Sequence, residues 1–216
     1  MRINVSYLIC SLAAAVLLGC ASGHHGTAKG DNNIIPRKEI ISPPAQSSVG
    51  RNFSPAKFQN LAIVCQATPG RIINPHDPRA AGAEKLSRIV EDEFVAALLK
   101  KGYTVASRRD VELALKEAPI GAGFDDKDAG PLARLLRVSG ILVVSGTGGH
   151  EYFSYKGKRY VRSSVHMSAR LISAENTEVV WIGTKTFNGD LEEHTLEVDW
   201  FAGHFREIAQ VFPDNR

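Results

Sequence analysis

The sequence contains little cysteine, with three such residues among 216, at positions 10, 20 and 65. Cys10 and Cys20 lie in or directly after an apolar run at the N-terminus, so Cys65 alone remains for the rest of the chain. This count excludes a disulfide framework of the kind that stabilises small secreted domains. Cys65 follows Leu61-Ala62-Ile63-Val64 and is expected to be a small, buried apolar residue.

The residue patterns of enzymes and metal sites are also missing. The seven histidines are scattered, and neither they nor the cysteines show the spacing of a zinc site. Ser145-Gly146-Thr147-Gly148-Gly149 lacks the lysine and the full glycine spacing of a phosphate-binding loop. Asp125, Asp126 and Asp128 do not follow a calcium-loop pattern, and helix capping accounts for them better. The sequence therefore predicts no catalytic residue, no metal and no cofactor.

A strong excess of charge of one sign is absent from most of the chain. Residues 21–58 carry five basic and two acidic residues, whereas residues 59–216 carry 20 basic and 21 acidic residues. The net positive charge therefore belongs to the segment before the main domain. Nothing in this distribution indicates a nucleic-acid partner.

The N-terminus has the pattern of an export signal. Arg2 precedes a largely apolar stretch over residues 3–18, which ends in Leu17-Leu18-Gly19-Cys20. A short basic start, an apolar run of this length and small residues at its end are typical of a cleaved signal peptide. A plain secretory signal or an uncleaved anchor is the alternative interpretation.

The final four residues of this signal resemble the lipobox of bacterial lipoproteins. The resemblance implies cleavage between Gly19 and Cys20 and attachment of lipid to the Cys20 sulfur. Several acyl chains hold a protein stably on a membrane, whereas one holds it only marginally. Ala21 stands where an aspartate would mark retention in the inner membrane, so the resemblance implies the outer membrane, on its periplasmic face.

The mature chain is predicted to consist of a linker and one domain. Residues 1–19 form the signal peptide, residues 20–57 a lipidated flexible linker, and residues 58–216 a periplasmic domain. Glycine, proline and serine are frequent in the linker, and apolar periodicity is weak. Its 37 residues after Cys20 reach about 120 Å when fully stretched, at ~3.3 Å per residue.

From residue 60 onward the pattern alternates between strands and helices. Asp77-Pro78 is typical of a helix start, and Ser107 with Asp110 resembles a capping box. Over residues 160–172, Val161, Val165, Met167, Ala169 and Leu171 alternate with polar side chains, which indicates a half-exposed antiparallel strand. The other expected strands lie at 61–65, 103–105, 141–144 and 178–187. The other expected helices are one that contains Leu132, Leu135 and Leu136 and one at about 197–212. The predicted class is α+β, with helices packed on a mixed sheet of three to five strands.

The order of these elements resembles the curli secretion-channel (CsgG-like) lipoprotein family. Its relatives include the LpoB-like activators of penicillin-binding proteins and the amino-terminal domain of TolB. The resemblance covers residues 59–187 and rests on Leu61-Ala62-Ile63-Val64, Lys101-Gly102-Tyr103, Val105 to Val111, Ile141 to Gly146, Ala169 to Ser173 and Glu178-Val179-Val180-Trp181.

Two departures from the family limit what the resemblance implies. Residues 148–160 and 173–177 are too short to hold two membrane-crossing hairpins, because each spanning strand takes about 9–11 residues. The resemblance therefore implies the family's periplasmic core without its pore. The long proline-rich tether of a peptidoglycan-synthase activator is missing as well. A pore-forming secretion component and such an activator stay as alternatives.

The segment 152–160 is the candidate contact with a partner, because it combines aromatic and basic residues in an expected hairpin. The candidate residues are Tyr152, Phe153, Tyr155, Lys158, Arg159 and Tyr160. Aromatic residues and arginine are enriched at protein interfaces, although the same aromatics would also serve to cover a sheet edge. The sequence thus predicts a non-enzymatic assembly module of the cell envelope, which binds a protein partner. Assembly into a homo-oligomer is left open.

Overall fold

The computed structural model describes residues 34–37, 39–67, 78–118, 124–193 and 198–215. The predicted signal peptide, its cleavage site at Gly19 and the lipid-bearing Cys20 lie outside these residues. The described part forms one compact unit, Ile34–Arg216.

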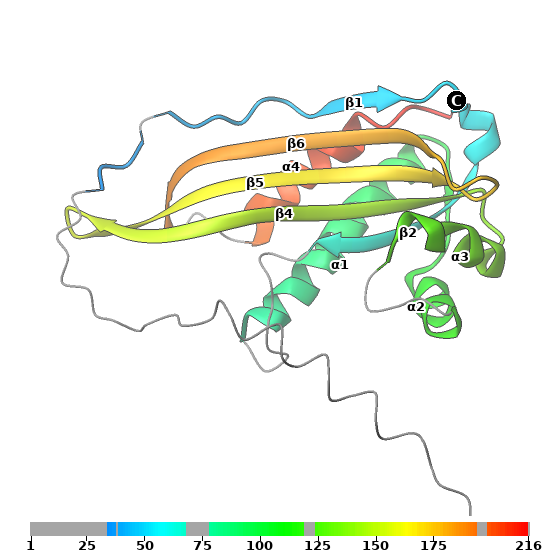
Figure 1. Ribbon diagram of the computed structural model, residues 1–216, viewed down its shortest axis with the longest axis horizontal. Coiled ribbons are helices and arrows are strands. Elements are labelled where there is room, and N and C mark those ends of the chain that lie inside the picture. Colours follow the sequence, from blue (N-terminus) through cyan, green and yellow to red (C-terminus); the bar gives the residue numbers. More distant parts are fainter. Residues whose placement is uncertain (1–33, 38, 68–77, 119–123, 194–197, 216) are drawn as a thin grey trace, which may run out of the picture. The chain divides into compact units, whose positions relative to one another are not determined.

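A six-stranded mixed sheet forms the centre of this unit (Figure 1). The spatial order of its strands is β1 (Gln46–Val49), β6 (Val179–Glu192), β5 (Lys158–Ser173), β4 (Gly140–Tyr155), β2 (Asn60–Ala67) and β3 (Thr104–Val105). In this order, each neighbouring pair among β1, β6, β5 and β4 is antiparallel. Strand β2 is parallel to its two neighbours, β4 and β3. The class predicted from the sequence, α+β with a mixed sheet, is confirmed. The sheet has one strand more than expected.

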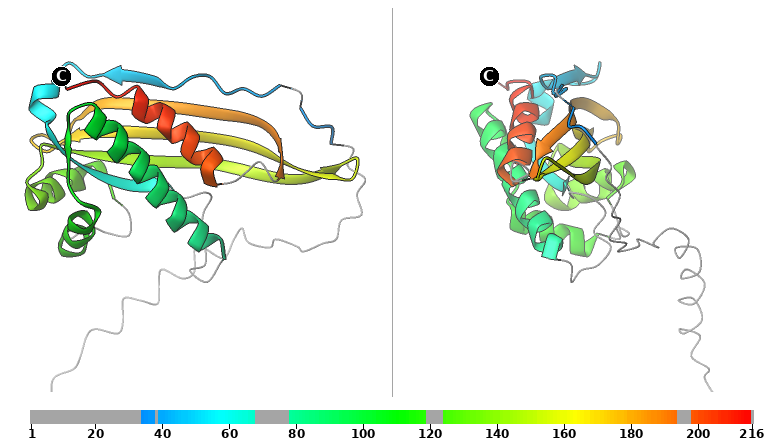
Figure 2. Two further views of the ribbon diagram at one scale, coloured as in Figure 1. Left: turned by 180° about the vertical axis from the view of Figure 1, so that it is seen from behind. Right: turned by 90° about the vertical axis from the view of Figure 1, so that its left-hand side faces the viewer.

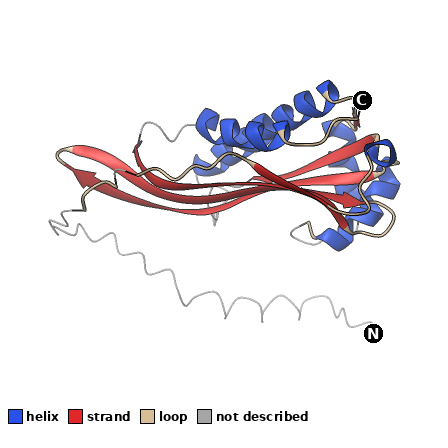
Figure 3. Ribbon diagram, turned by 90° about the horizontal axis from the view of Figure 1, so that it is seen from above, coloured by secondary structure: helices blue, strands red, loops and turns tan. Residues whose placement is uncertain are grey.

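Helices pack on both faces of the sheet. One face carries α1 (Pro78–Lys100) and α4 (Val198–Gln210), which cross it side by side (Figure 2). The other face carries α2 (Arg108–Glu117) and α3 (Ala129–Leu136) near one end only (Figure 1). The short 3-10 helices η1 (Pro55–Phe58) and η2 (Asp126–Asp128) lie in the connections. The view from above shows the long central strands running beyond the helices (Figure 3).

Strand alternation explains the two parts of the core. Leu142 and Val144 of β4 face α1 and α4, where Phe94, Leu98 and Phe205 are buried. The intervening β4 residues face the other way, and the second apolar cluster contains Ile141, Val143, Val111, Leu132 and Ala133. Each buried side chain of this size contributes about 1.5–3 kcal/mol relative to exposure. Beyond residue 145, no residue of β4 is fully buried, and the side chains are half-buried or exposed.

The helix ends follow the local sequence. Ser107 caps α2, and its hydroxyl accepts a hydrogen bond from the Asp110 N–H at 3.2 Å. Asp125 and Asp128 form a reciprocal capping box around η2, as helix capping predicts for these acids. Gly102 follows α1 with φ of 89°, a conformation that glycine adopts without steric cost.

The N-terminal boundary of the domain differs from the prediction. Residues up to 57 were expected to be linker, but residues 34–37 and 39–49 follow β6 along its outer edge. Gln46–Val49 pair with residues 181–184, and the N–H groups and carbonyls of Ile41 and Asn188 bond reciprocally at 2.8 and 2.9 Å. We call this edge segment the strap. The strap is held to β6 by backbone hydrogen bonds, and most of its side chains are exposed, so apolar periodicity did not reveal it.

Candidate interaction surface at the β4–β5 hairpin

The predicted hairpin is present, and its turn is tight. Lys156 and Gly157 connect β4 to β5 with φ of 49° and 76°. Two central residues with positive φ are typical of a type I′ turn, whose twist matches that of the strands. The pairing continues without a register shift from Tyr155/Lys158 to Gly140/Ser173. The structure thus places the candidate contact residues at one end of the sheet.

One face of the hairpin carries an ordered aromatic and arginine cluster. The rings of Phe153 and Tyr160 stack at 5.6 Å between centroids, and the Arg162 guanidinium lies 5.3 Å from the centre of the Phe153 ring. Arg162 also donates two hydrogen bonds to Asp190 of β6, at 3.0 and 2.9 Å. The Asp190 side chain is fully buried and accepts a third bond, from the Arg37 N–H at 2.8 Å.

These contacts set the charge state of Asp190. Burial alone would raise the pKa of its carboxyl, but the bonds from Arg162 and from the Arg37 backbone outweigh it and lower that pKa. The same pairing raises the pKa of Arg162. Asp190 therefore stays ionised and ties the strap, β6 and β5 together.

The expected basic tip is balanced by acids from β6 and the residues after it. Lys158 donates to Glu192 at 2.8 Å, and Arg159 lies 2.9 Å from Glu193. The hydrogen bond to Glu192 raises the pKa of Lys158. Lys156, in the turn, lies over the ring of Tyr155 at 5.3 Å. The tip therefore presents aromatic rings and balanced charges rather than a positive patch.

The opposite face of the hairpin is turned toward α4. His150 bonds the Ser163 hydroxyl at 2.9 Å and packs against Phe201, and its burial lowers its pKa. Tyr152, the next residue on this face, is 57% exposed. Exposed aromatic surface thus begins where the cover from α4 ends.

The outer edge of β4 is open among the described residues. The pairing with β2 ends at Ala67/Gly146, whereas β4 continues to Tyr155. A two-residue turn makes Tyr155/Lys158 a hydrogen-bonded pair, so alternate residues of β4 bond to β5. The residues between them direct their N–H and C=O groups outward. They are Gly148, His150, Tyr152 and Ser154.

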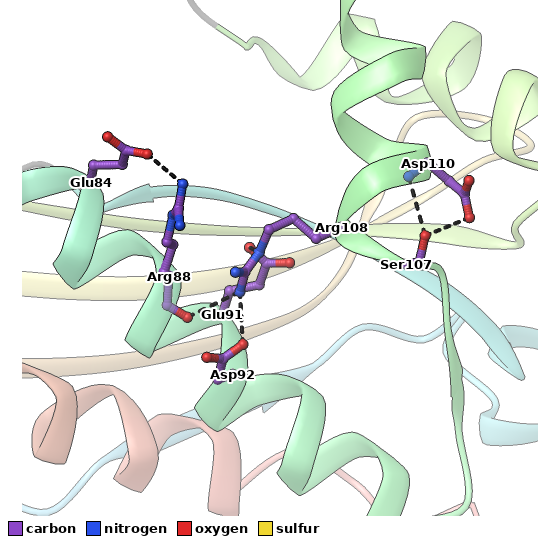
Figure 4. Close-up of polar contacts among 7 residues, drawn as sticks. All are labelled: Glu84, Arg88, Glu91, Asp92, Ser107, Arg108 and Asp110. Atoms are coloured by element: carbon purple, nitrogen blue, oxygen red, sulfur yellow. Dashed lines mark hydrogen bonds and ion pairs between the residues drawn. The ribbon is translucent and has the colours of Figure 1, made fainter.

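Another dense set of polar contacts joins α1 to α2 (Figure 4). Arg108 donates to Glu91 at 2.8 Å, to Asp92 at 2.7 Å and to the Arg88 carbonyl at 3.3 Å. Burial raises the pKa of Glu91, with Arg108 opposing that shift. The Nε–H and Nη2 groups of Arg108 make these bonds, so the cluster holds the start of α2 against α1.

The remaining candidates are structural in the described part of the chain. Ser145 to Gly149 continue β4 instead of forming a loop. No group of three or more potential metal ligands comes together among the described residues. A cavity of about 440 Å³ lies between α2 and α3, where Leu113 and Leu135 are half exposed. Of the helices that the structure describes, none has the length and apolarity to cross a membrane.

Comparison with known proteins gives no family assignment. No protein-family model matches the sequence, and no curated protein matches it either. Among solved structures, the chain is similar to a single-substitution variant of the PelC dodecamer from Paraburkholderia phytofirmans, with 18% identity and a TM-score of 0.42 over 79% of this chain and 96% of that one.

Two further solved structures are similar over a smaller part of this chain. The LpoB C-terminal domain from Salmonella enterica has 15% identity and a TM-score of 0.39, over 67% of this chain and 88% of that one. Lipoprotein GNA1162 from Neisseria meningitidis has 16% identity and a TM-score of 0.41, over 67% and 90%. At these values the likeness assigns no partner or activity, and membership of the CsgG-like family stays a prediction.

Proposed function

We propose that the protein is a non-enzymatic, lipid-anchored module that binds a protein of the cell envelope at the hairpin end of its sheet. Lipid on Cys20 holds it on the periplasmic face of the outer membrane. The partner contributes an extended segment, which pairs with the open edge of β4.

The observation that carries this proposal is the open edge itself, residues 147–155. Natural proteins blunt exposed sheet edges with proline, lysine or bulges, because an unpaired edge recruits other strands. This edge has no proline, no lysine and one charged residue, Glu151. Its pairing with β5 contains no bulge. An unpaired edge without these protective features can pair with a strand from another protein.

The affinity and the selectivity of such an edge have separate sources. Each backbone hydrogen bond to an added strand contributes about 0.5–1.5 kcal/mol net. Side chains next to the edge then select the sequence of the partner. Tyr152 lies on one face of β4, and Phe153 and Tyr155 lie on the other. A partner strand with apolar residues on both faces is expected to fit.

A proline at the edge tests the proposal. The Tyr152 N–H points away from β5, so Tyr152→Pro removes one outward donor without breaking a bond within the hairpin. Tyr152→Thr is the matched control, since it also loses the ring but keeps the N–H. Each variant and the parent, with its lipid, is purified from membranes of the source bacterium, and the bound envelope protein is quantified.

The partner is expected with the parent and with Tyr152→Thr. Recovery with Tyr152→Pro should be about 2- to 13-fold lower than with Tyr152→Thr, as the loss of one bond of about 0.5–1.5 kcal/mol predicts. Equal recovery with all three proteins would refute pairing at this edge. The denaturant midpoint of each variant checks that the domain remains folded. If the bound protein is a second copy of the chain, size measurement in detergent will show an oligomer that Tyr152→Pro converts to monomer. That result would refute the proposal of an envelope partner.

A further inference from the structure

The strap brings the start of the domain to the hairpin end of the sheet. Going backward from Val49, the strap passes β6 from Trp181 to Asp190. Along this path the Lys185 ammonium donates to the Pro43 carbonyl at 3.0 Å. Asp190 is the register partner of Arg162, which in turn opposes Glu151 in the hairpin. The first residues of the strap therefore lie beside the hairpin, as the blue segment in Figure 1 shows.

The strap also shortens the connection to Cys20. The expected linker of 37 residues after Cys20 would have reached about 120 Å. With the strap held on the sheet, 14 residue steps separate Cys20 from Ile34. They span at most about 46 Å.

This short connection selects an orientation of the domain. β6 has 14 residues and is therefore about 46 Å long. If the hairpin pointed away from the membrane, Ile34 would stand at least that far from the lipid, and the connection would have to be fully stretched. With the hairpin toward the membrane, Ile34 lies close to the lipid and the connection need not be stretched, so this orientation is favoured.

The composition of the tip fits a membrane surface. Tyr152 is 57% exposed on one face, and Tyr155 is half-buried on the other, beside the turn. Tyrosine is enriched where membranes meet water, because its ring is apolar and its hydroxyl is polar. The pairs Lys158–Glu192 and Arg159–Glu193 cancel most of the local charge.

We propose that the hairpin tip lies against the phospholipid headgroups of the membrane that holds Cys20, with Tyr152 and Tyr155 at the interface. This inference rests on the lipid anchor of the proposed function. Because the charges at the tip are balanced, the contact depends on the aromatic rings and only weakly on anionic lipid. In this orientation the open edge of β4 lies near the membrane surface, where it can pair with partner segments that run close to the membrane.

Photocrosslinking of the lipidated full-length protein tests this contact without any partner present. The variant Tyr155→p-benzoylphenylalanine places the reactive ketone at the tip. The control, Leu113→p-benzoylphenylalanine, places it in α2, where the neighbouring Asn60 and Val138 mark the opposite end of the sheet. Leu113 is 47% exposed, so both probes are accessible. Each protein is reconstituted in phosphatidylcholine vesicles and in vesicles that also contain phosphatidylglycerol.

The tip probe is expected to form a phospholipid adduct in both kinds of vesicle, with at least a several-fold excess over the Leu113 probe. No adduct at the tip, or equal adducts at the two positions, would overturn the inference. Adducts only in the vesicles with phosphatidylglycerol would overturn it as well, since charge would then govern the contact. The proposed function has its own readout, the lower recovery of partner with Tyr152→Pro, so either can fail alone.

Discussion

Lys185→Met is expected to release the strap while leaving the sheet intact. Lys185 is 4% exposed, and its ammonium donates to the Pro43 carbonyl at 3.0 Å and to Glu207 at 2.6 Å. Methionine fills a similar volume but donates no hydrogen bond. The variant therefore leaves the strap carbonyl and the α4 carboxylate without this partner.

The expected cost follows from the two lost bonds. Hydrogen bonds to charged groups contribute about 1.5–3 kcal/mol. The Glu207 side chain is 42% exposed and regains hydration, so we expect about 2 kcal/mol in total. With a urea dependence of about 2 kcal/mol per molar, the midpoint should fall by about 1 M. The matched control is Lys57→Met, because the pair Lys57–Glu175 is largely exposed and should change stability by less than about 1 kcal/mol.

Hydrogen exchange locates the effect. In Lys185→Met the amides of Gln46–Val49 should exchange faster, whereas those of β4 and β5 should keep their protection. A loss of stability no larger than that of Lys57→Met would refute the assigned role of Lys185. Unchanged protection of Gln46–Val49 would refute the reasoning that links Lys185 to the strap.

Three further variants test separate features. Gly183→Ala should lower the unfolding free energy by about 1–3 kcal/mol, because its Cβ would lie 2.5 Å from the Trp181 ring and 2.7 Å from Ile208; unchanged stability in denaturant would contradict this packing. Lys156→Asn should raise stability by about 0.5–1 kcal/mol, since asparagine tolerates positive φ, and an unchanged urea midpoint would count against the type I′ turn. Burial and the nearby Lys185 lower the pKa of His204 in the folded state. The neutral His204 side chain therefore contributes its full stabilisation above pH 6.5, the ordinary pKa, and this contribution is lost as the pH falls through the lower pKa of the folded state. The denaturant midpoint should therefore fall as the pH is lowered below 6.5, and it should fall less steeply for His204→Gln. Equal slopes of midpoint against pH in the parent and in His204→Gln would contradict this role of His204.

The sequence predicted those elements whose signals are local. The capped start of α2 at Ser107 stands where the pattern placed it. The alternation over residues 160–172 predicted β5 because one face of this strand is buried and the other is not. In each case the side chains near the position determine the structure.

Features that depend on distant partners were missed. All four residues of β1 are exposed, so their strand conformation comes from backbone bonds to β6 and leaves no apolar pattern. The expected strand ended at residue 144, but pairing with β5 extends β4 through the glycines at 148 and 149. β6 was expected to end at Phe187. Because it continues to Glu192, the acids that balance Lys158 and Arg159 could not be foreseen.

The strap has a consequence for the order in which the chain folds. Its bond from Arg37 to Asp190 spans 153 residues, so the strap has nothing to pair with until β6 has been delivered. Closing so long a loop is entropically costly, and such contacts form late in folding. When the strap pairs with β6, the segment from Ile34 to Val49, about 50 Å long when extended, becomes part of the domain. With the proposed lipid on Cys20, docking of the strap would shorten the distance that the folded domain can reach from the membrane.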